Sequence, residues 1–297
     1  MHFNSHRKSP RLLLGSLVWV LLGWGLVDLP PARAQSAAPV RVTFLHHSTG
    51  GCVWEGGVPA WFTRYNQDHG TQYQIAEHAF PDSPYEWANY PYDYWNLWVN
   101  PSGPANTTQS GVYTLEQWCA GAEVVVFKHC FPVSSIGPDE GTPSVSSGEK
   151  TLANYKLRYA ALKVKLHQFP TKKFIVWTGA ALTEGSTNPE EAARAREFFA
   201  WVRTTWDEPG DNIFVWDFWT LETEGGLYLK AAYSSDGDSH PNGTFCQRVA
   251  PFFGQRVVDV IEGRGDTGSL TGQPVVLAAP EIIQQPEPAA PVAGTTV

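Results

Sequence analysis

A serine flanked by two histidines and two glycines follows the first strand-like run of this chain. The segment reads RVTFLHHSTGG, and Ser48 lies where β-favouring residues give way to a Gly-Gly pair. A serine hydroxyl is a weak nucleophile unless a base removes its proton and a third group fixes the tautomer of that base. The segment is therefore either a polar loop or, if a histidine and a carboxylate reach Ser48, part of a catalytic site.

The residues that Ser48 would need occur together near the other end of the chain, in the segment SSDGDSHPNGTF. Asp236, Asp238 and His240 lie there on a stretch rich in glycine, serine and proline, immediately before a predicted helix. Taken alone, this segment indicates a turn in which Asn242 caps that helix. Taken with Ser48, it supplies nucleophile, acid and base in the chain order Ser, Asp, His, and we favour this functional interpretation.

An alternation of strands and helices must bring these two segments together. Short apolar runs rich in β-branched residues predict strands over residues 40–45, 71–79, 122–128, 172–179 and 211–218. Apolar spacings of three and four, with capping and stop signals, predict helices over residues 58–69, 149–169, 189–206 and 244–261. This order predicts an α/β fold with a mostly parallel five-stranded sheet, whose functional residues lie beyond the carboxyl ends of the strands.

The motifs at the two ends of this region resemble a known superfamily. The strand that leads to Ser48, and the DSHPN segment before the last helix, are similar to those of SGNH (GDSL-like) hydrolases. More narrowly, FLHHSTGG, VVVFKHCFP and GDSHPN resemble a group of secreted bacterial proteins of this type. The resemblance covers most of residues 40–261 and implies a flavodoxin-like three-layer sandwich. It also implies esterase, lipase, carbohydrate deacetylase or acyltransferase activity.

Carried over residue by residue, the resemblance assigns the nucleophile to Ser48 and the general base to His240. The superfamily usually places its acid three residues before the histidine, and this chain has Gly237 there. We take Asp238 as the acid, because DSHP recurs in the narrower group, and keep Asp236 as the alternative. The predicted catalytic set is therefore Ser48, Asp238 and His240.

The oxyanion-stabilising residues of the superfamily have no counterpart in this chain. The resemblance implies a glycine after the second strand and an asparagine after the third, whereas this chain has HAFPDSPYEW and KHCFP at those places. One such donor contributes about 2.7–4 kcal/mol to transition-state stabilisation. Other groups would have to line the oxyanion and substrate pocket: backbone N–H groups at Ser48 and Thr49, and Gly50, His47, Lys128, His129 and Asn96. Lys128 would either pair with a carboxylate such as Asp93 or polarise the site.

Two competing uses of these residues are metal binding and sugar binding. His46, His47, His129 and His240 match no zinc signature, and neighbouring residues on a strand point to opposite faces, so we expect neither a metal nor another cofactor. The segment PYEWANYPYDYWNLW interleaves Tyr and Trp with polar residues. It would either stack on sugar rings or fold down into the core.

The two ends of the chain and its cysteines indicate export. Basic residues, an apolar stretch and an A-x-A site predict a signal peptide over residues 1–34, with a retained membrane anchor as the alternative. We expect a secreted or periplasmic protein without a membrane span after processing, with its folded domain at 38–263 and a disordered Pro/Ala-rich tail at 268–297. Four cysteines allow two disulfides, of which we prefer Cys52 to Cys130.

Composition limits the partners that this chain is expected to bind. The 297 residues carry a formal charge of −8, which disfavours a nucleic-acid partner. The sequence thus predicts a secreted serine esterase that forms an acyl-enzyme from a small acyl ester or an acylated glycan, with O-acetyl esters as the preferred substrates. The alternatives are an O-acyltransferase and a non-catalytic envelope protein that binds glycan on the same fold.

Overall fold

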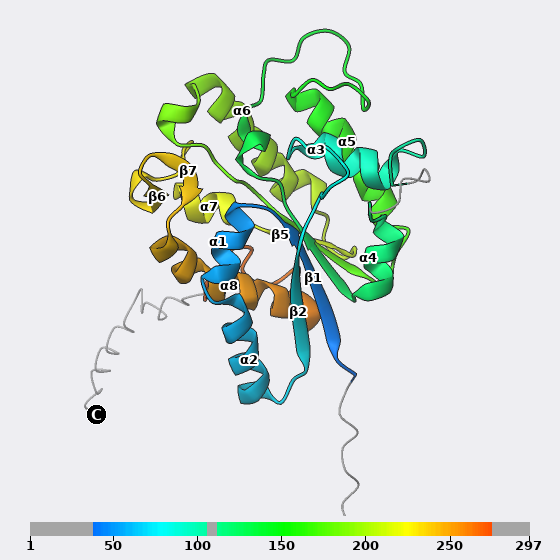
Figure 1. The fold of residues 1–297 in the computed structure, drawn as a ribbon, viewed down its shortest axis with the longest axis vertical. Coiled ribbons are helices and arrows are strands. Elements are labelled where there is room, and N and C mark those ends of the chain that lie inside the picture. The colour runs from blue at the N-terminus through cyan, green and yellow to red at the C-terminus, as the bar shows by residue number, and fades with distance from the viewer. Residues whose placement is uncertain (1–37, 106–111, 275–297) are drawn as a thin grey trace, which may run out of the picture. The chain divides into compact units, whose positions relative to one another are not determined.

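Five parallel strands form the central sheet of the protein. The computed structural model describes residues 38–105 and 112–274, so the expected signal peptide and residues 275–297 of the expected tail lie outside the described residues. The sheet has the order β2-β1-β3-β4-β5 (Figure 1). Its strands are β1 (Val40–His46), β2 (Tyr73–Ala79), β3 (Val124–Phe127), β4 (Lys173–Trp177) and β5 (Ile213–Trp216).

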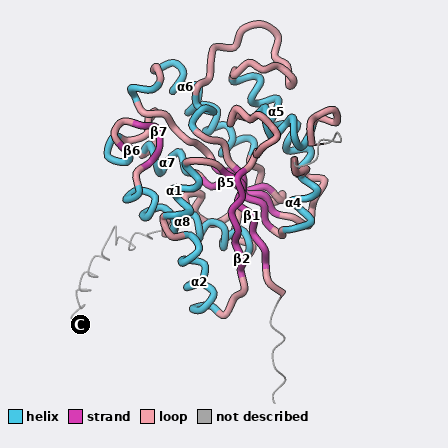
Figure 2. The backbone as a smooth tube through the Cα atoms, in the orientation of Figure 1, coloured by secondary structure: helices cyan, strands magenta, loops and turns pink. Residues whose placement is uncertain are grey.

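Helices cover both faces of this sheet, which confirms the predicted three-layer α/β fold (Figures 1 and 2). One face packs on α1 (Thr49–Glu55), α2 (Val58–His69) and α8 (Gly243–Ile261). The other face packs on α4 (Leu115–Gly121), α5 (Leu152–Leu166) and α6 (Pro189–Trp201). Shorter elements complete the order: α3 (Pro91–Tyr94), η1 (Trp95–Val99), η2 (Phe131–Ser134), η3 (Glu184–Ser186), η4 (Val202–Trp206), α7 (Phe218–Thr223), η5 (Ala231–Tyr233), β6 (Ser234–Ser235) and β7 (Asp238–Pro241).

The side chains of β3 explain why both faces need a helical layer. Val125 and Phe127 enter one hydrophobic cluster, while Val124 and Val126 enter the cluster on the other face. Because side chains alternate along a strand, a continuous apolar run has to be buried on both sides. The helices begin where their capping residues predict. Asn188 accepts a hydrogen bond from the N–H of Glu191 at the start of α6, and Asn242 likewise caps α8.

The chain crosses from one half of the sheet to the other between β1 and β3. After β1 it turns aside to form the edge strand β2, and then returns to place β3, β4 and β5 on the opposite side of β1. Ligands of open α/β sheets bind at such a switch point, beyond the carboxyl ends of the strands. The residues that follow β1 and β3 therefore lie where this fold most often carries function.

Several segments differ from the sequence-based expectation. Helix α1 was not predicted, because its first three residues, Thr-Gly-Gly, favour a turn. The helix expected over 189–206 is α-helical to Trp201 and continues as the π-helical turn η4. The segment with Asp238 and His240, expected as a loop, forms the hairpin of β6 and β7.

The domain also continues past the expected boundary at residue 263. The N–H of Asp217 donates to the carbonyl of Leu270, and the indole N–H of Trp216 donates to the carbonyl of Thr271. The side chain of the buried Arg256 donates to the carbonyl of Gly265. Residues 264–274 thus pack against the end of β5 and against α8. None of the helices within residues 38–105 and 112–274 combines the length and apolar character needed to cross a membrane.

Candidate active site

Ser48 lies at the sharp turn between β1 and α1. Its backbone has a φ of 53°, which is uncommon for a residue other than glycine. Such strained conformations concentrate at functional sites, because the surrounding structure has to hold them in place. The side chain of Ser48 is exposed to solvent at the carboxyl end of β1. The fold therefore presents this hydroxyl at the edge of the sheet.

Asp238 and His240 lie two residues apart on β7. Asp236 and Gly237 form the turn of the hairpin, with φ angles of 50° and 79°. Both angles are positive, as in a type I′ turn, for which Asp-Gly is a favoured pair. Since side chains alternate along a strand, Asp238 and His240 point to the same side of β7. This geometry lets the carboxylate reach the imidazole with a spacing of two residues rather than three.

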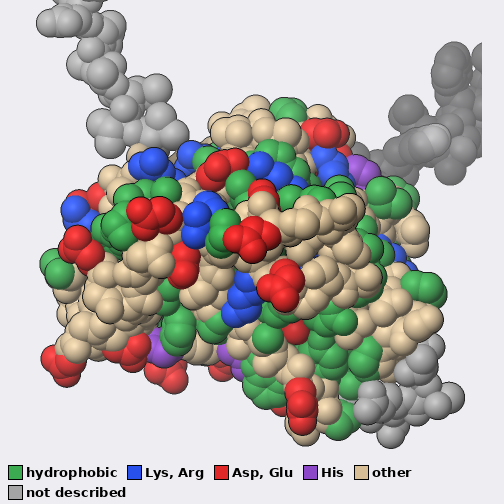
Figure 3. All heavy atoms as spheres, turned by 90° about the horizontal axis from the view of Figure 1, so that it is seen from above, with side chains coloured by type: hydrophobic (Ala, Val, Ile, Leu, Met, Phe, Trp, Pro, Cys, Tyr) green, Lys and Arg blue, Asp and Glu red, His purple; other side chains and the backbone are tan. Residues whose placement is uncertain are grey.

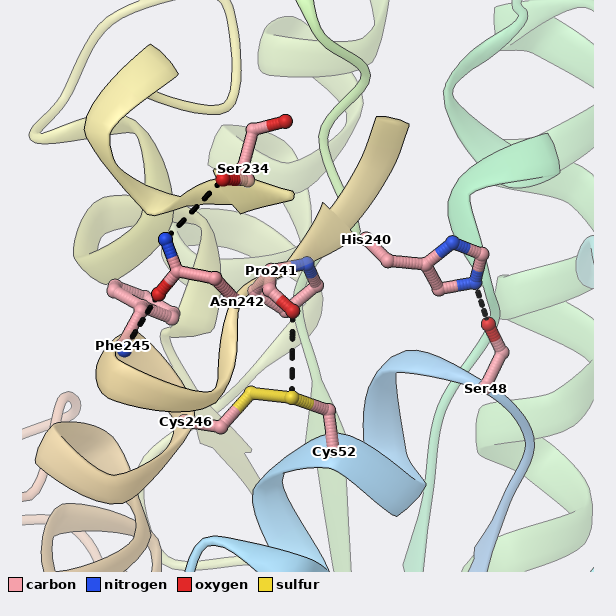
Figure 4. The surroundings of a disulfide bond; sticks show 8 residues. All are labelled: Ser48, Cys52, Ser234, His240, Pro241, Asn242, Phe245 and Cys246. Carbon is pink, nitrogen blue, oxygen red and sulfur yellow. Dashed lines mark hydrogen bonds between the residues drawn. A yellow bond between two sulfur atoms is a disulfide. The ribbon is translucent and has the colours of Figure 1, made fainter. Parts of the chain in front are cut away.

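The three side chains form one hydrogen-bonded row. The Nε2 atom of His240 bonds the hydroxyl of Ser48, although 192 residues separate them in the chain (Figure 4). On the other side of the ring, Nδ1 lies 2.9 Å from Oδ2 of Asp238. This bond with His240 is the main cause that lowers the pKa of Asp238 below its ordinary value. The row has the order nucleophile, imidazole, carboxylate that activates a serine.

A disulfide joins the two elements that carry this row. Cys52, in α1, is bonded to Cys246, in α8, one helical turn after the segment with His240 (Figure 4). The predicted bridge between Cys52 and Cys130 is therefore wrong. Helix α1 turns Cys52 away from the sheet edge and onto α8, while Cys130 and Cys119 are buried free thiols.

His47 is fixed between the turn and the aromatic segment. Its Nε2 atom bonds the carbonyl of Pro81, and its ring stacks on Trp87 at 4.7 Å between centroids, with 3° between the planes. Trp87 is 37% exposed, so one aromatic surface stays open close to Ser48. Most other aromatic residues of this segment are core: Tyr85, Tyr90, Tyr94, Trp95 and Trp98 are buried.

Lys128 lies under the turn, at the end of β3. Its Nζ atom donates to the carbonyl of His47 at 3.2 Å and to Sγ of Cys130 at 3.3 Å. The expected alternative of a pair with Asp93 is not formed. The carboxylate of Asp93 instead accepts hydrogen bonds from Tyr85 and from the backbone N–H of Ala88.

Some predicted pocket residues lie apart from the hydroxyl of Ser48. His129 is buried and bonds the hydroxyl of Tyr159, and burial lowers its pKa to about 3. Asn96 bonds Tyr85 and Asn100 within the aromatic segment.

The two residues that follow Ser48 are both buried. The backbone N–H groups of Ser48 and Thr49 were the predicted oxyanion donors, and because Thr49 is fully buried, Ser48 is the one that lies at the surface. Gly50 is a packing residue, because a Cβ there would lie 2.5 Å from Cβ of His46.

Three contributions to the site were not anticipated from the sequence. Phe131 packs its ring edge-on against His240 at 5.1 Å. Ser239, which is buried, accepts a hydrogen bond from the N–H of Thr183 and so anchors β7. Cys130 donates its S–H to the carbonyl of His47 at 3.1 Å. The alternation of side chains after β3 was the available signal for Cys130, since positions 128 and 130 share a side.

The surface charges and the net charge of the protein do not favour an anionic ligand. On the face shown in Figure 3, acidic and basic side chains are interspersed over the surface. The net charge of the chain is −8, and the candidate site itself carries the exposed carboxylate of Asp238. An uncharged substrate group therefore suits this site better than a phosphate or carboxylate.

Comparison of the chain with models of protein families, with curated proteins and with solved structures found no match. The similarity to SGNH hydrolases accordingly rests on motifs of this chain. The site itself consists of an exposed hydroxyl, an imidazole bonded to it, and a carboxylate bonded to that imidazole.

Proposed function

We propose that the protein is a serine ester hydrolase of the SGNH type. The observation that carries this proposal is the hydrogen-bonded row of Ser48, His240 and Asp238. A row of this kind has a recognised chemistry, and its members come from opposite ends of the domain. The positive φ of Ser48 adds support, because a strained residue that serves only packing is uncommon.

The reaction would proceed through an acyl-enzyme. Ser48 Oγ attacks the carbonyl carbon of an ester while His240 Nε2 takes the hydroxyl proton, and Asp238 stabilises the imidazolium that forms. Collapse of the tetrahedral intermediate breaks the bond to the alcohol, which leaves with the proton from His240. Water, deprotonated by the same imidazole, then releases the acid and restores the serine.

We propose O-acyl, and preferably O-acetyl, esters of glycans as the substrate class. The exposure of Ser48 and Asp238 favours an ester presented on a large molecule over one that must be enclosed. The open ring of Trp87 beside His47 offers a face on which a sugar can stack. A sugar hydroxyl in place of water would make the same acyl-enzyme a transferase.

The test is ester hydrolysis combined with active-site labelling. The purified protein is expected to release nitrophenol from nitrophenyl acetate and to be labelled by a fluorophosphonate. Ser48→Ala should lose both signals, whereas Ser83→Ala, which changes an exposed serine of the neighbouring loop, should keep them. Labelling that persists in Ser48→Ala, or is absent from the wild type, would refute the proposal.

The exposed Trp87 also supports a second candidate, a non-catalytic glycan-binding protein. That function predicts glycan binding that Ser48→Ala leaves intact and Trp87→Ala abolishes, with no ester hydrolysis by the wild type. Binding of an unacetylated and an O-acetylated glycan, measured by calorimetry beside the hydrolysis assay, separates the two functions.

A further inference from the structure

The peptide bond that precedes Ser48 is held by three donors from the buried side of the turn. The carbonyl oxygen of His47 accepts from Lys128 Nζ at 3.2 Å, from Cys130 Sγ at 3.1 Å and from the N–H of Gly50 at 3.0 Å. A carbonyl oxygen has two lone pairs, so convergence of three donors on one acceptor is unusual. The hydrogen bonds among Ser48, His240 and Asp238 do not account for this arrangement.

Lys128 is the member of this group that packing explains least. Its side chain is 2% exposed, and its hydrogen bonds go to a carbonyl and a thiol rather than to a carboxylate. Glu222, a buried carboxyl whose charge would interact with Lys128, has a pKa raised well above its usual range by burial. Placing a lysine in such surroundings costs free energy, and an apolar residue of similar length would avoid that cost.

We propose that Lys128 and Cys130 are positioning residues that orient and polarise the His47–Ser48 peptide, so that its N–H stabilises the oxyanion of the ester reaction. In a trans peptide the N–H points away from the C=O, so fixing the oxygen of His47 also fixes the direction of the Ser48 N–H. Donors on the oxygen strengthen the N–H as a donor, because hydrogen bonds in a chain polarise one another. This inference rests on the proposed esterase function and deepens it.

Three further observations fit this role. Within residues 38–105 and 112–274, the N–H of Ser48 makes no hydrogen bond and is free to donate to a substrate. The clamp formed by Lys128 and Cys130 also spans the switch point of the sheet, because Lys128 follows β3 and Ser48 follows β1. The glycine and asparagine that the resemblance implied as oxyanion donors are missing from this chain. A polarised Ser48 N–H would compensate in part for their absence.

The decisive variant is Lys128→Met, which keeps the length of the side chain and removes its donors. With nitrophenyl acetate, kcat should fall about 10²-fold, the loss typical of an oxyanion donor. KM should stay within about twofold, because the interaction is made in the transition state. The thermal unfolding temperature of Lys128→Met should stay close to that of the wild type, since an apolar side chain of similar length fills the same buried space.

Two variants of Cys130 test the second donor. Cys130→Ser keeps a donor and should retain more of kcat than Cys130→Ala.

The matched control is Lys150→Met. Lys150 Nζ also donates to a main-chain carbonyl at 3.2 Å, that of Pro132 in η2, the short helix that follows β3. This variant should keep kcat within about threefold of wild type, as expected for a residue outside the transition state. If Lys128→Met keeps kcat to the same extent, or if Lys150→Met loses as much as Lys128→Met does, the proposal is wrong.

A measurement on the peptide itself separates failure of the clamp from failure of the proposed function. The ¹³C resonance of the His47 carbonyl should move upfield in Lys128→Met and in Cys130→Ala, because each loses a donor to that oxygen. It should stay unchanged in Lys150→Met. If the wild type hydrolyses no ester, the proposed function fails and takes the catalytic role of the clamp with it. An unchanged resonance in both clamp variants would overturn the clamp whether or not the protein is an esterase.

Discussion

Asp238, rather than Asp236, is the carboxylate that bonds the imidazole of His240. Asp238 reaches Nδ1 of His240 at 2.9 Å, whereas Asp236 lies at the turn of the hairpin. If the proposed mechanism holds, Asp238→Asn should lower kcat by about 10²–10⁴-fold, because the imidazole loses the group that fixes its tautomer. Asp236→Asn should stay within about threefold of wild type. Steady-state kinetics on one nitrophenyl ester compares the two variants, and equal losses would contradict this assignment.

His129 predicts how stability depends on pH. Burial lowers its pKa from the ordinary 6.5 to about 3, so between these values the unfolded chain binds a proton that the folded chain does not. The contribution of His129 to the free energy of unfolding is therefore fully present above pH 6.5 and is lost as the pH falls towards 3. The slope approaches about 1.4 kcal/mol per pH unit for one proton.

Urea unfolding between pH 7 and pH 4 measures this slope. His129→Gln should flatten the dependence relative to wild type, because the side chain no longer titrates. His69→Gln, at an exposed position on α2, is the control and should leave the slope unchanged. A slope in His129→Gln as steep as that of the wild type would exclude His129 as a source of the pH dependence.

Substitutions at the adjacent Gly50 and Gly51 can show whether the packing of α1 fixes the position of Ser48. A Cβ at Gly50 would lie 2.5 Å from Cβ of His46, whereas at Gly51 the nearest atom, Cε1 of His46, would be 3.9 Å away. Gly50→Ala should destabilise the protein by about 1–3 kcal/mol, as overpacking does, and should lower the rate of fluorophosphonate labelling of Ser48. Gly51→Ala should be neutral or stabilising by up to about 1 kcal/mol, since alanine favours the helix.

Thermal unfolding and labelling rates distinguish these outcomes. Equal stability of the two alanine variants would mean that α1 can shift on β1 without cost. Loss of stability in Gly50→Ala without any change in labelling would mean that the helix does not control the position of the hydroxyl.

At the scale of the domain, residues 264–274 are structural. Removing residues 264–297 would leave without acceptors the donors that now bond the carbonyls of Gly265, Leu270 and Thr271. An unsatisfied buried donor costs about 1–3 kcal/mol, so this truncation should destabilise the domain severely. Truncation after residue 274 keeps all three bonds and should leave the urea midpoint close to that of the full chain. Equal urea midpoints for the two truncated proteins would mean that the folded domain ends at residue 263.

Periodic patterns predicted most of the fold. Apolar runs located all five strands of the sheet, and capping residues such as Asn188 and Asn242 located the helix starts to within a few residues. Helix α1 was missed because its intrinsic propensity is poor. Packing of Gly50 on His46 and of Val53 in the core stabilises it instead. Long-range packing of this kind has no local signature in a sequence.

The sequence predicted those residues of the site that interact with close neighbours in the chain. It predicted less well the residues whose contacts join distant segments. The spacing of Asp238 and His240 is a property of one strand, and the Asp-Gly pair before it already indicates a hairpin. The disulfide partner of Cys52 depends on the direction in which α1 runs, so the predicted partner was wrong. The contact of Lys128 with the carbonyl of His47 depends on neighbouring strands that lie far apart in the chain, so only a role near the site could be anticipated.

The Cys52–Cys246 bond closes a covalent ring that contains most of the domain. A protease that cuts once within residues 53–245 leaves the two fragments linked, and they separate on a gel only after reduction. Ser48 lies shortly before Cys52 in the chain, and His240 lies shortly before Cys246, inside the ring. A molecule cut once in a surface loop between these two segments would thus keep Ser48 and His240 tethered to each other through the disulfide.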